Sequence, residues 1–441
     1  MNTNAIRHLY IHIPFCHRRC SYCDFNTYAN MDYRMEAYVD ALVTELHMLA
    51  ETYASNPQSS VLSPQPSVLT RSSLRPTVFL GGGTPSMLPL PLMERVLAAA
   101  GRIVPLAGAE VTVEANPGTV LGGDYLSGLR GMGVNRLSMG VQTLHDPTLR
   151  VLGRIHTADE ARTSFDDARR AGFDNVNVDF IFGLPGQTVE QWRESLDVIA
   201  TWGADHLSLY SLILEPDTPL FAQVTAGRVS VPDDDDAGAM YEAAIELLPS
   251  AGYVQYEISN WAKAQNVKLK IENVEMVAAP LPTMGVLAPT HNTPSAPFSI
   301  FNFQFSIPEG ACHHNLAYWL NADYLAAGAG AHGHVYPRRY ADVLGIDDYI
   351  RAVDDGKLPV REETPLSEAD LRAETMFMGL RLNAGVSNAH FRDRCGLSLD
   401  QAYGDVLGQL AAQGLLERDE GGVRLTDRGR MLGNQVFARF V

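Results

Sequence analysis

The chain has 441 residues, of which 46% are hydrophobic and 19% charged, a composition typical of a globular protein with a large domain and one or two smaller ones. Its formal net charge of -17 at pH 7 argues against a protein whose main task is to bind nucleic-acid phosphate, which calls for a basic surface. No stretch is typical of a membrane span, and residues 1–15 lack the pattern of a secretory leader, so we expect a cytoplasmic protein.

Three of the five cysteines lie within eight residues, directly after a short apolar run over residues 9–13. They follow a CxxxCxxC spacing: Cys16, Cys20 and Cys23. Thiols this dense, in a chain without a secretory leader, indicate metal ligands before disulfides. An iron–sulfur cluster normally takes four cysteines, so a cubane held by three leaves one iron open to a small molecule. The alternative is a structural zinc site that adds His12 or His17 to the thiolates.

The first helix is predicted over residues 33–50, where apolar side chains recur at helical spacing. These side chains are Met35, Val39, Leu42, Leu46 and Leu49. The next segment, residues 51–76, is rich in Ser, Pro and Gln, a composition typical of a flexible insertion.

A pattern of apolar strand, polar or glycine-rich turn and helix then repeats along the chain. The six predicted strands are 9–13, 77–80, 110–113, 136–139, 176–180 and 206–209. Strands that alternate with helices form parallel sheets with right-handed crossovers. The unusual clusters follow their strands, and α/β barrels place active sites at the carboxyl ends of strands. We therefore expect the cysteines, glycines and isolated carboxylates to meet on one rim.

The repeat ends near residue 220, so the first domain is predicted over 1–220 and a barrel extension over 221–366. Within this extension, residues 265–310 are rich in proline and carry no charge from 277 to 308, which favours a disordered insertion. The last domain, 367–441, has two helices and then strand, Gly-Gly turn, strand and helix, a pattern like a winged helix. Its acidic and basic residues alternate, so it is interpreted as a packing or partner domain that does not bind DNA.

The cysteine spacing, with the flanks YIHIPFC and YCDF, resembles the radical S-adenosylmethionine (SAM) superfamily. Within it the chain is similar to the branch of oxygen-independent coproporphyrinogen III oxidases and HemW-type haem chaperones. The resemblance implies an α/β fold, a partial (β/α)6 barrel with a C-terminal α+β winged-helix-like domain. It also implies a [4Fe-4S] cluster on Cys16, Cys20 and Cys23, SAM on the open iron, and an electron donor for the cluster. In that superfamily the cluster cleaves SAM to a 5'-deoxyadenosyl radical.

The same resemblance assigns a SAM pocket to residues at successive strand ends. Glycines after a strand let the backbone approach a ligand closely, and a carboxylate that ends an apolar strand is unusual. Taken alone, each of these residues is more often structural, and Glu114 serves equally well as a cap or ion-pair partner. The residues implied for SAM are Tyr10, Gly82, Gly83, Thr84, Glu114, Gln142, Arg154 and Asp179.

Two features separate the branches of this family. The oxidases have a further cysteine where Phe25 stands and a longer N-terminal extension. The second feature is an HNxxYW motif that resembles the haem-associated motif of HemW-type proteins: His314, Asn315, Tyr318 and Trp319. A histidine can bind haem iron and aromatic side chains can stack on a macrocycle, so His314 is the predicted haem ligand. Rival ligands are Cys312, His313, His332 and His334.

The favoured function is therefore a haem chaperone that binds haem and transfers it to haem-accepting proteins. A chaperone need not turn over SAM, so the sequence leaves the assignment as an enzyme undecided. The alternative is an oxygen-independent coproporphyrinogen III oxidase, which decarboxylates its substrate in porphyrin biosynthesis. A third interpretation, a regulator that binds DNA through the C-terminal module, is disfavoured by the acidic charge.

Overall fold

The structure, a computed structural model, describes residues 6–53, 71–264 and 308–441. A nine-stranded sheet forms the centre of this described part. In spatial order its strands are β11 (Leu325–Ala327), β1 (His8–Ile13), β4 (Thr77–Gly82), β5 (Glu110–Ala115), β6 (Arg136–Gln142), β7 (Val176–Phe182), β8 (His206–Ser211), β10 (Asn260–Lys263) and β9 (Tyr253–Glu257). From β11 to β8 neighbouring strands are parallel, whereas β10 and β9 are antiparallel additions at the far edge.

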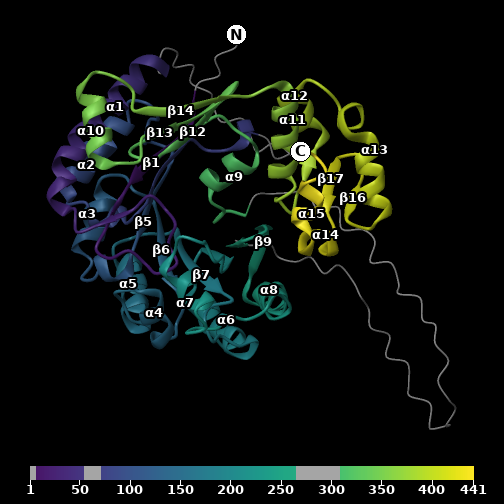
Figure 1. Cartoon of the computed structure of the whole chain (residues 1–441), viewed down its shortest axis with the longest axis horizontal. Coiled ribbons are helices and arrows are strands. Elements are labelled where there is room, and N and C mark those ends of the chain that lie inside the picture. The colour runs from purple at the N-terminus through teal and green to yellow at the C-terminus, as the bar shows by residue number, and fades with distance from the viewer. Residues whose placement is uncertain (1–5, 54–70, 265–307) are drawn as a thin grey trace, which may run out of the picture.

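The six strands predicted from the sequence are β1, β4, β5, β6, β7 and β8, and they lie side by side in chain order. Helices follow them on the outside of the sheet (Figure 1). These helices are α1 (Met35–Tyr53), α2 (Leu90–Ala100), α3 (Asp124–Gly131), α4 (Asp146–Leu152), α5 (Ala158–Arg170), α6 (Val189–Trp202), α7 (Pro219–Thr225) and α8 (Asp234–Leu247). The predicted (β/α)6 arrangement is therefore confirmed. The helix expected over 33–50 is α1.

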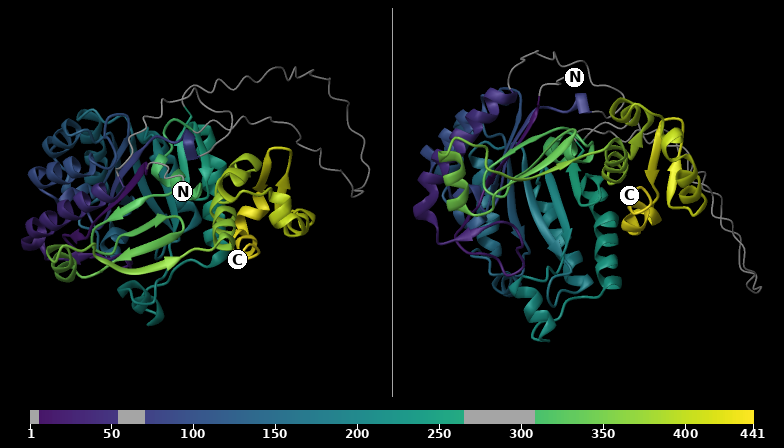
Figure 2. Two further views of the ribbon diagram at one scale, coloured as in Figure 1. Left: turned by 90° about the horizontal axis from the view of Figure 1, so that it is seen from above. Right: turned by 45° about the horizontal axis from the view of Figure 1, so that its top comes forward.

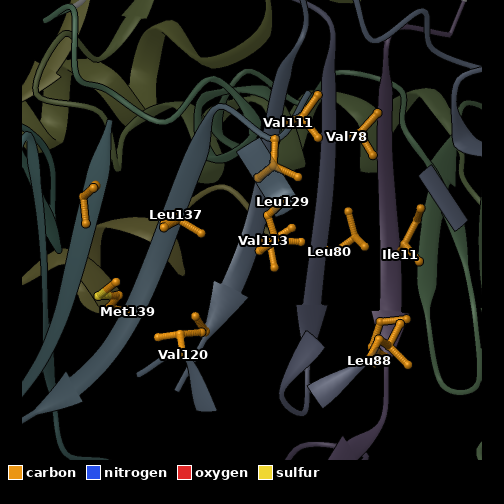
Figure 3. Packing of buried hydrophobic residues seen from close by; sticks show 14 of the residues in the cluster. Ile11, Val78, Leu80, Leu88, Val111, Val113, Val120, Leu129, Leu137 and Met139 are labelled. Atoms are coloured by element: carbon orange, nitrogen blue, oxygen red, sulfur yellow. The ribbon is translucent and has the colours of Figure 1, made fainter. Parts of the chain in front are cut away.

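The two faces of the parallel strands carry different side chains because strand residues alternate from face to face. Aliphatic residues such as Val78, Val111 and Leu137 are fully buried and share one apolar cluster with Leu129 of α3 (Figure 3). The alternate positions carry aromatic and polar groups, which face the inside of the curved sheet. These inner residues include Tyr10, Phe79, Thr112, Glu114 and Ser138. The outer face thus stabilises the fold and leaves the inner face for chemistry.

Past β8 the chain also forms a second, small sheet. This sheet is antiparallel and has the order β12 (His332–Val335), β13 (Arg338–Asp342) and β14 (Val360–Pro365). Two further helices belong to this part of the chain: α9 (His313–Trp319) packs against β4 and α11, and α10 (Ile346–Asp354) packs against α1. A two-stranded pair, β2 (Phe15–Cys16) and β3 (Tyr28–Ala29), brackets the cysteine loop.

The C-terminal segment forms a separate lobe beside the barrel, drawn in yellow in Figures 1 and 2. Its helices are α11 (Glu368–Gly379), α12 (Asn388–Cys395), α13 (Leu399–Ala412), α14 (Asp427–Met431) and α15 (Gly433–Phe437). Its strands, β15 (Val386–Ser387), β17 (Gly422–Leu425) and β16 (Leu416–Arg418), make a three-stranded sheet in that order. The lobe has its own apolar core, which includes Met376, Phe391 and Leu407. The predicted succession of strand, Gly-Gly turn, strand and helix is present.

The two predicted insertions fall largely outside the described residues. Residues 51–53 end α1 and 71–73 form a 3-10 turn, whereas 54–70 are not described. The insertion predicted over 265–310 is described only from residue 308. The central sheet also draws β9, β10 and β11 from beyond residue 220, within the range predicted as the barrel extension. In the described ranges, no helix is long and apolar enough to cross a membrane.

Candidate functional site

The cysteine loop is fixed by backbone hydrogen bonds on two sides. On one side Gly83 and Thr84 donate their amides to the carbonyls of Ile13 and Phe15, at 2.8 and 2.7 Å. The Thr84 hydroxyl also lies 3.6 Å from Sγ of Cys16. On the other side the amide of Ser21 donates to Leu152 at 2.9 Å. The loop is therefore held between the carboxyl end of β4 and the last residue of α4.

The glycines after β4 make this close approach possible. A Cβ at Gly83 would lie 2.6 Å from the carbonyl oxygen of Phe15, and one at Gly82 would lie 2.4 Å from the ring of His12. Gly82 also has a φ of +108°, a conformation that L side chains rarely adopt. Its amide donates to Oε2 of Glu114 at 3.0 Å. The triple glycine thus joins the cysteine loop to the predicted SAM carboxylate.

Two carboxylates predicted for the SAM pocket lie on the inner face of the sheet. Glu114 is the last residue but one of β5 and is half-buried, and burial, with the nearby Asp179 as a second cause, raises its pKa to about 7. Burial also raises the pKa of Asp179, while Asn177 donates to it at 2.7 Å and Ser138 at 3.2 Å. Perturbed carboxyl groups that share a concave site are typical of functional positions.

Gln142 and Arg154 meet over a third glycine. Gln142 has a φ of +70° at a register shift in β6, a backbone strain that redirects the end of the strand. A Cβ at Gly140 would lie 2.8 Å from Nε2 of Gln142 and 3.2 Å from Nη2 of Arg154, so only glycine leaves room for both. Arg154 donates to the carbonyl of Gly140 at 2.5 Å and to Sγ of Cys20 at 3.5 Å. A guanidinium therefore lies directly beside the cysteine loop.

The donor set fits an iron–sulfur cluster better than a zinc ion. All three thiols are free, and burial raises the pKa of Cys16 to about 11, so assembly must displace protons. Both ring nitrogens of His12 are occupied, by Tyr10 at 3.0 Å and Asn26 at 2.9 Å. Among the described residues no three metal-binding side chains converge as the ligands of one ion do. Each thiolate of a cubane binds a different iron, which needs no such convergence.

The HNxxYW motif enters the barrel from the opposite end. It forms α9, whose first amides, those of His313 and His314, donate to Glu110 at 3.0 Å each. Nδ1 of His314 lies 2.7 Å from the hydroxyl of Thr77. Glu110 and Thr77 are the first residues of β5 and β4. Helix α9 therefore closes the amino ends of the strands, whereas the cysteine loop covers their carboxyl ends.

The predicted haem ligand is buried and both of its ring nitrogens are occupied. His314 is 2% exposed, and its Nε2 lies 2.9 Å from the hydroxyl of Tyr318. Its ring also stacks on Phe79, with centroids 5.0 Å apart. Burial lowers the pKa of His314 well below its usual value, so the ring is neutral. A metal can reach Nε2 only where the Tyr318 hydroxyl gives way.

A cavity of ≈ 640 Å³ lies between these two ends. Three of the eight residues predicted for SAM line it, whereas the three cysteines and His314 do not. Its walls include Tyr10, Gly82 and Glu114 from the predicted SAM pocket and Tyr318 from the motif. Phe25, which is 63% exposed, also lines it. The other lining residues are His12, Arg19, Asp24, Asn26, Thr27, Tyr28, Tyr324, Gly330, His332 and Leu344. Among the rival haem ligands, exposed His332 reaches this cavity, whereas Cys312, His313 and His334 do not line it.

Sequence reasoning missed Asn26 and Tyr324 in this site. Asn26 follows the cysteine loop and donates to the carbonyls of Ala329 and Leu344, at 2.9 and 3.0 Å. Tyr324 precedes β11, a strand too short to predict. The signal for Asn26 in the sequence was its place three residues after Cys23, whereas Tyr324 had none.

Comparisons with known proteins agree with this architecture. The model described as the Radical SAM superfamily matches residues 68–199, and the HemN C-terminal domain matches 366–432. The first match begins after the cysteine loop. In a solved structure, the coproporphyrinogen III oxidase HemN from Escherichia coli superposes with a TM-score of 0.74 at 23% identity, over 100% of this chain and 91% of that one. At this identity the likeness shows a shared fold.

Relatives of known sequence are similar from end to end. The haem chaperone HemW of Bacillus subtilis (strain 168) is 34% identical over 434 residues, which cover 98% of both chains. The haem chaperone HemW of Lactococcus lactis is 32% identical over 98% of this chain and 96% of its own. These alignments include the cysteine loop, the barrel and the C-terminal lobe. The chain therefore belongs to the HemW family of the radical SAM superfamily.

Proposed function

We propose that this protein is a haem chaperone, which binds haem and transfers it to haem-accepting proteins. The observation that carries the proposal is the cavity of ≈ 640 Å³, in which Tyr318 of the HNxxYW motif faces residues predicted for SAM. The relatives at 34% and 32% identity over nearly their whole length bear the name haem chaperone, which supports the same function. The cavity supplies a concave, partly aromatic site of the kind that holds cofactors.

Cys16, Cys20 and Cys23 would hold the [4Fe-4S] cluster, and the rim residues around them would hold SAM. Gly82 and Gly83 offer backbone atoms that no Cβ shields, and Glu114 offers a carboxyl group to a ligand amine. Gln142, Arg154, Thr84, Tyr10 and Asp179 complete the proposed SAM set. When bound, a cluster of this type supplies an electron to SAM. The chain's own residues bind and orient both groups and exclude water from the inner face of the sheet.

His314 is the proposed haem ligand, through Nε2. That atom points at the Tyr318 hydroxyl, and Tyr318 lines the cavity, so only one side chain separates the imidazole from the cargo space. Tyr324 stands against Tyr318 and adds a second ring to the same wall. Aromatic faces of this kind can stack on a macrocycle.

The second candidate is oxygen-independent coproporphyrinogen III oxidase activity. The HemN C-terminal domain match and the shared fold with the Escherichia coli oxidase favour it. Phe25 argues in the other direction, since it projects an apolar ring into the cavity mouth where the oxidases are expected to have a cysteine.

The deciding experiment uses anaerobically reconstituted full-length protein. It is titrated with haem and followed by the Soret band, and in parallel it is assayed for decarboxylation of coproporphyrinogen III with SAM and a reductant. Stoichiometric haem binding without turnover supports the chaperone, and SAM-dependent decarboxylation supports the oxidase. Cys16→Ala serves as the cluster control: iron content equal to that of the wild type would refute the cluster site.

The proposed partners are haem, haem-accepting proteins and an electron donor for the cluster, and the proposed location is the cytoplasm. Transfer to an acceptor can be followed directly, because haem moving from the loaded protein to an added apo-acceptor changes the Soret band. If the loaded protein transfers haem to no haem-accepting protein, it binds haem but is not a chaperone.

A further inference from the structure

A second cavity lies beside the large one and shares two tyrosines with it. Its volume is ≈ 240 Å³. Tyr318 and Tyr324 line both cavities, and their rings meet edge to face with centroids 4.7 Å apart. The wall on the far side includes Trp319, His334 and Arg339, from α9, β12 and β13. The tyrosine pair therefore stands between the two spaces.

Three buried nitrogen atoms around this small cavity have no hydrogen-bond partner among the described residues: Nε1 of Trp319, Nε2 of His334 and Nη2 of Arg339. The indole and guanidinium groups can only donate. A buried donor without an acceptor costs free energy, so native structures rarely keep several together. The cluster indicates that the cavity receives a group rich in acceptors.

The local charges favour an anionic acceptor. Glu374 accepts from Nε of Arg339 at 2.9 Å and offsets part of its charge, and Tyr324 is a second neighbour of the guanidinium, whose Nη2 still has no hydrogen-bond partner among the described residues. The guanidinium of Arg381 lies 4.4 Å from the ring centroid of Trp319 and adds a second positive charge. His334 is 1% exposed, and burial lowers its pKa to about 3, so its ring is neutral and can donate from Nε2.

We propose that the small cavity binds a carboxylate group of the cargo, with Arg339 and Trp319 as its hydrogen-bond donors. The inference rests on the proposed haem function, because haem carries two propionate side chains at one edge of its ring. A macrocycle in the large cavity would place that edge against Tyr318 and Tyr324. A planar guanidinium suits the two oxygens of a carboxylate, and such charge-assisted bonds are among the stronger ones.

The test compares haem with its dimethyl ester, in which both propionates are neutral. The reconstituted full-length protein is titrated with each ligand, and the Soret band gives the two dissociation constants. We expect haem to bind roughly tenfold more tightly than the ester, because loss of a charge-assisted hydrogen bond has about that effect. Arg339→Gln and Trp319→Phe should each reduce this preference, and they should affect the ester much less.

Arg338→Gln is the matched control, since the neighbouring Arg338 pairs with Glu363 at 3.2 Å and does not line the cavity. It should keep the full preference for haem. The double variant Arg339→Gln/Glu374→Gln leaves no unpaired carboxylate, so its loss of preference would come from the missing donor and not from misfolding. Equal binding of haem and ester by the wild type, or a preference that survives both Arg339→Gln and Trp319→Phe, would overturn the inference. A wild type that binds neither ligand would instead refute the proposed function.

Discussion

At the scale of single residues, the glycines after β4 act through the space that they leave empty. Gly83 lies so close to the preceding strand that a Cβ would stand 2.6 and 2.8 Å from two backbone carbonyl oxygens. Backbone atoms cannot turn aside as a flexible side chain can. The cysteine loop can therefore take this position only because Gly83 has no Cβ.

We expect Gly83→Ala to lower the free energy of unfolding by about 1–3 kcal/mol, the usual cost of an overpacked site. It should also reduce the iron retained after reconstitution, because the loop that carries Cys16 must shift. Urea unfolding and iron analysis measure the two effects. Gly408→Ala is the control, since a Cβ there meets nothing within 4 Å in helix α13 and alanine favours a helix. Equal stability of the two variants would contradict the prediction.

Variants of His314 and Tyr318 test whether His314 is a haem ligand or a structural histidine. Tyr318→Phe removes the hydroxyl that occupies Nε2 of His314 and leaves the ring wall in place. If Nε2 binds iron, we expect Tyr318→Phe to bind haem at least as tightly as the wild type and His314→Ala to lose the axial-ligand signature of the Soret band. The cluster iron should be unchanged in both. Parallel losses of haem affinity in the two variants would show that His314 only holds Tyr318 in place.

At the scale of elements, the carboxylate of Glu110 holds the first turn of α9. Glu110 accepts the first two amides of the helix, and its negative charge suits the amino end of the helix dipole. It is also a counter-charge for the fully buried Arg136. Glu110 therefore joins the motif helix to the sheet, together with the bond between His314 and Thr77.

Glu110→Ala should lower the free energy of unfolding by about 3 kcal/mol, because it removes charge-assisted bonds and leaves Arg136 short of a partner. Glu110→Gln keeps one acceptor and should cost roughly half as much. Denaturant unfolding gives both values, and haem titration reports whether α9 still supports the cavity. The exposed Glu94 of α2 supplies the control, since Glu94→Ala should stay within about 0.5 kcal/mol of the wild type. Similar effects at Glu110 and Glu94 would remove the role assigned to Glu110.

The sequence predicted these elements unevenly, for physical reasons. The six parallel strands and the helix that became α1 have strong periodicity, and local pattern decides them. Strand β11 has three residues and no alternation, so nothing local marks it. The position of α9 depends on pairs such as Thr77 and His314, which are separated by 237 positions in the chain. That the cysteines, glycines and carboxylates meet on one rim could be predicted, because α/β barrels place such residues at the carboxyl ends of their strands. That the HNxxYW motif enters from the opposite end could be seen only in the tertiary structure.

At the scale of the whole molecule, two buried carboxyl groups join the first helix to the last part of the barrel. Glu45 of α1 accepts from the amide of Gly328 at 2.9 Å and from the hydroxyl of Tyr349 in α10 at 2.5 Å. Asp342 of β13 lies beside it, and neither residue is more than 1% exposed. Burial, with Glu45 as the second cause, raises the pKa of Asp342 to about 10. The folded pair therefore holds a proton at neutral pH.

The unfolded chain releases that proton, because a free carboxyl group has a pKa near 4. Stability is therefore fully present at low pH and is lost as the pH rises toward the raised pKa of Asp342. Between pH 7 and 9 we expect Asp342→Asn to gain about 1.4 kcal/mol per pH unit relative to the wild type, as measured by urea unfolding. Asp354→Asn, at an exposed site on α10, should follow the wild type. Parallel curves for wild type and Asp342→Asn would contradict the shared proton.

The place of β11 at the edge of the sheet also has a consequence for synthesis. Leu9 of β1 pairs with Leu325, so one edge of the first strand has no partner until most of the chain has left the ribosome. An apolar strand with an open edge can pair with other chains, and closing so long a loop is slow. Nascent chains truncated before residue 325 should therefore depend on chaperones, or aggregate, more than chains that extend past residue 327.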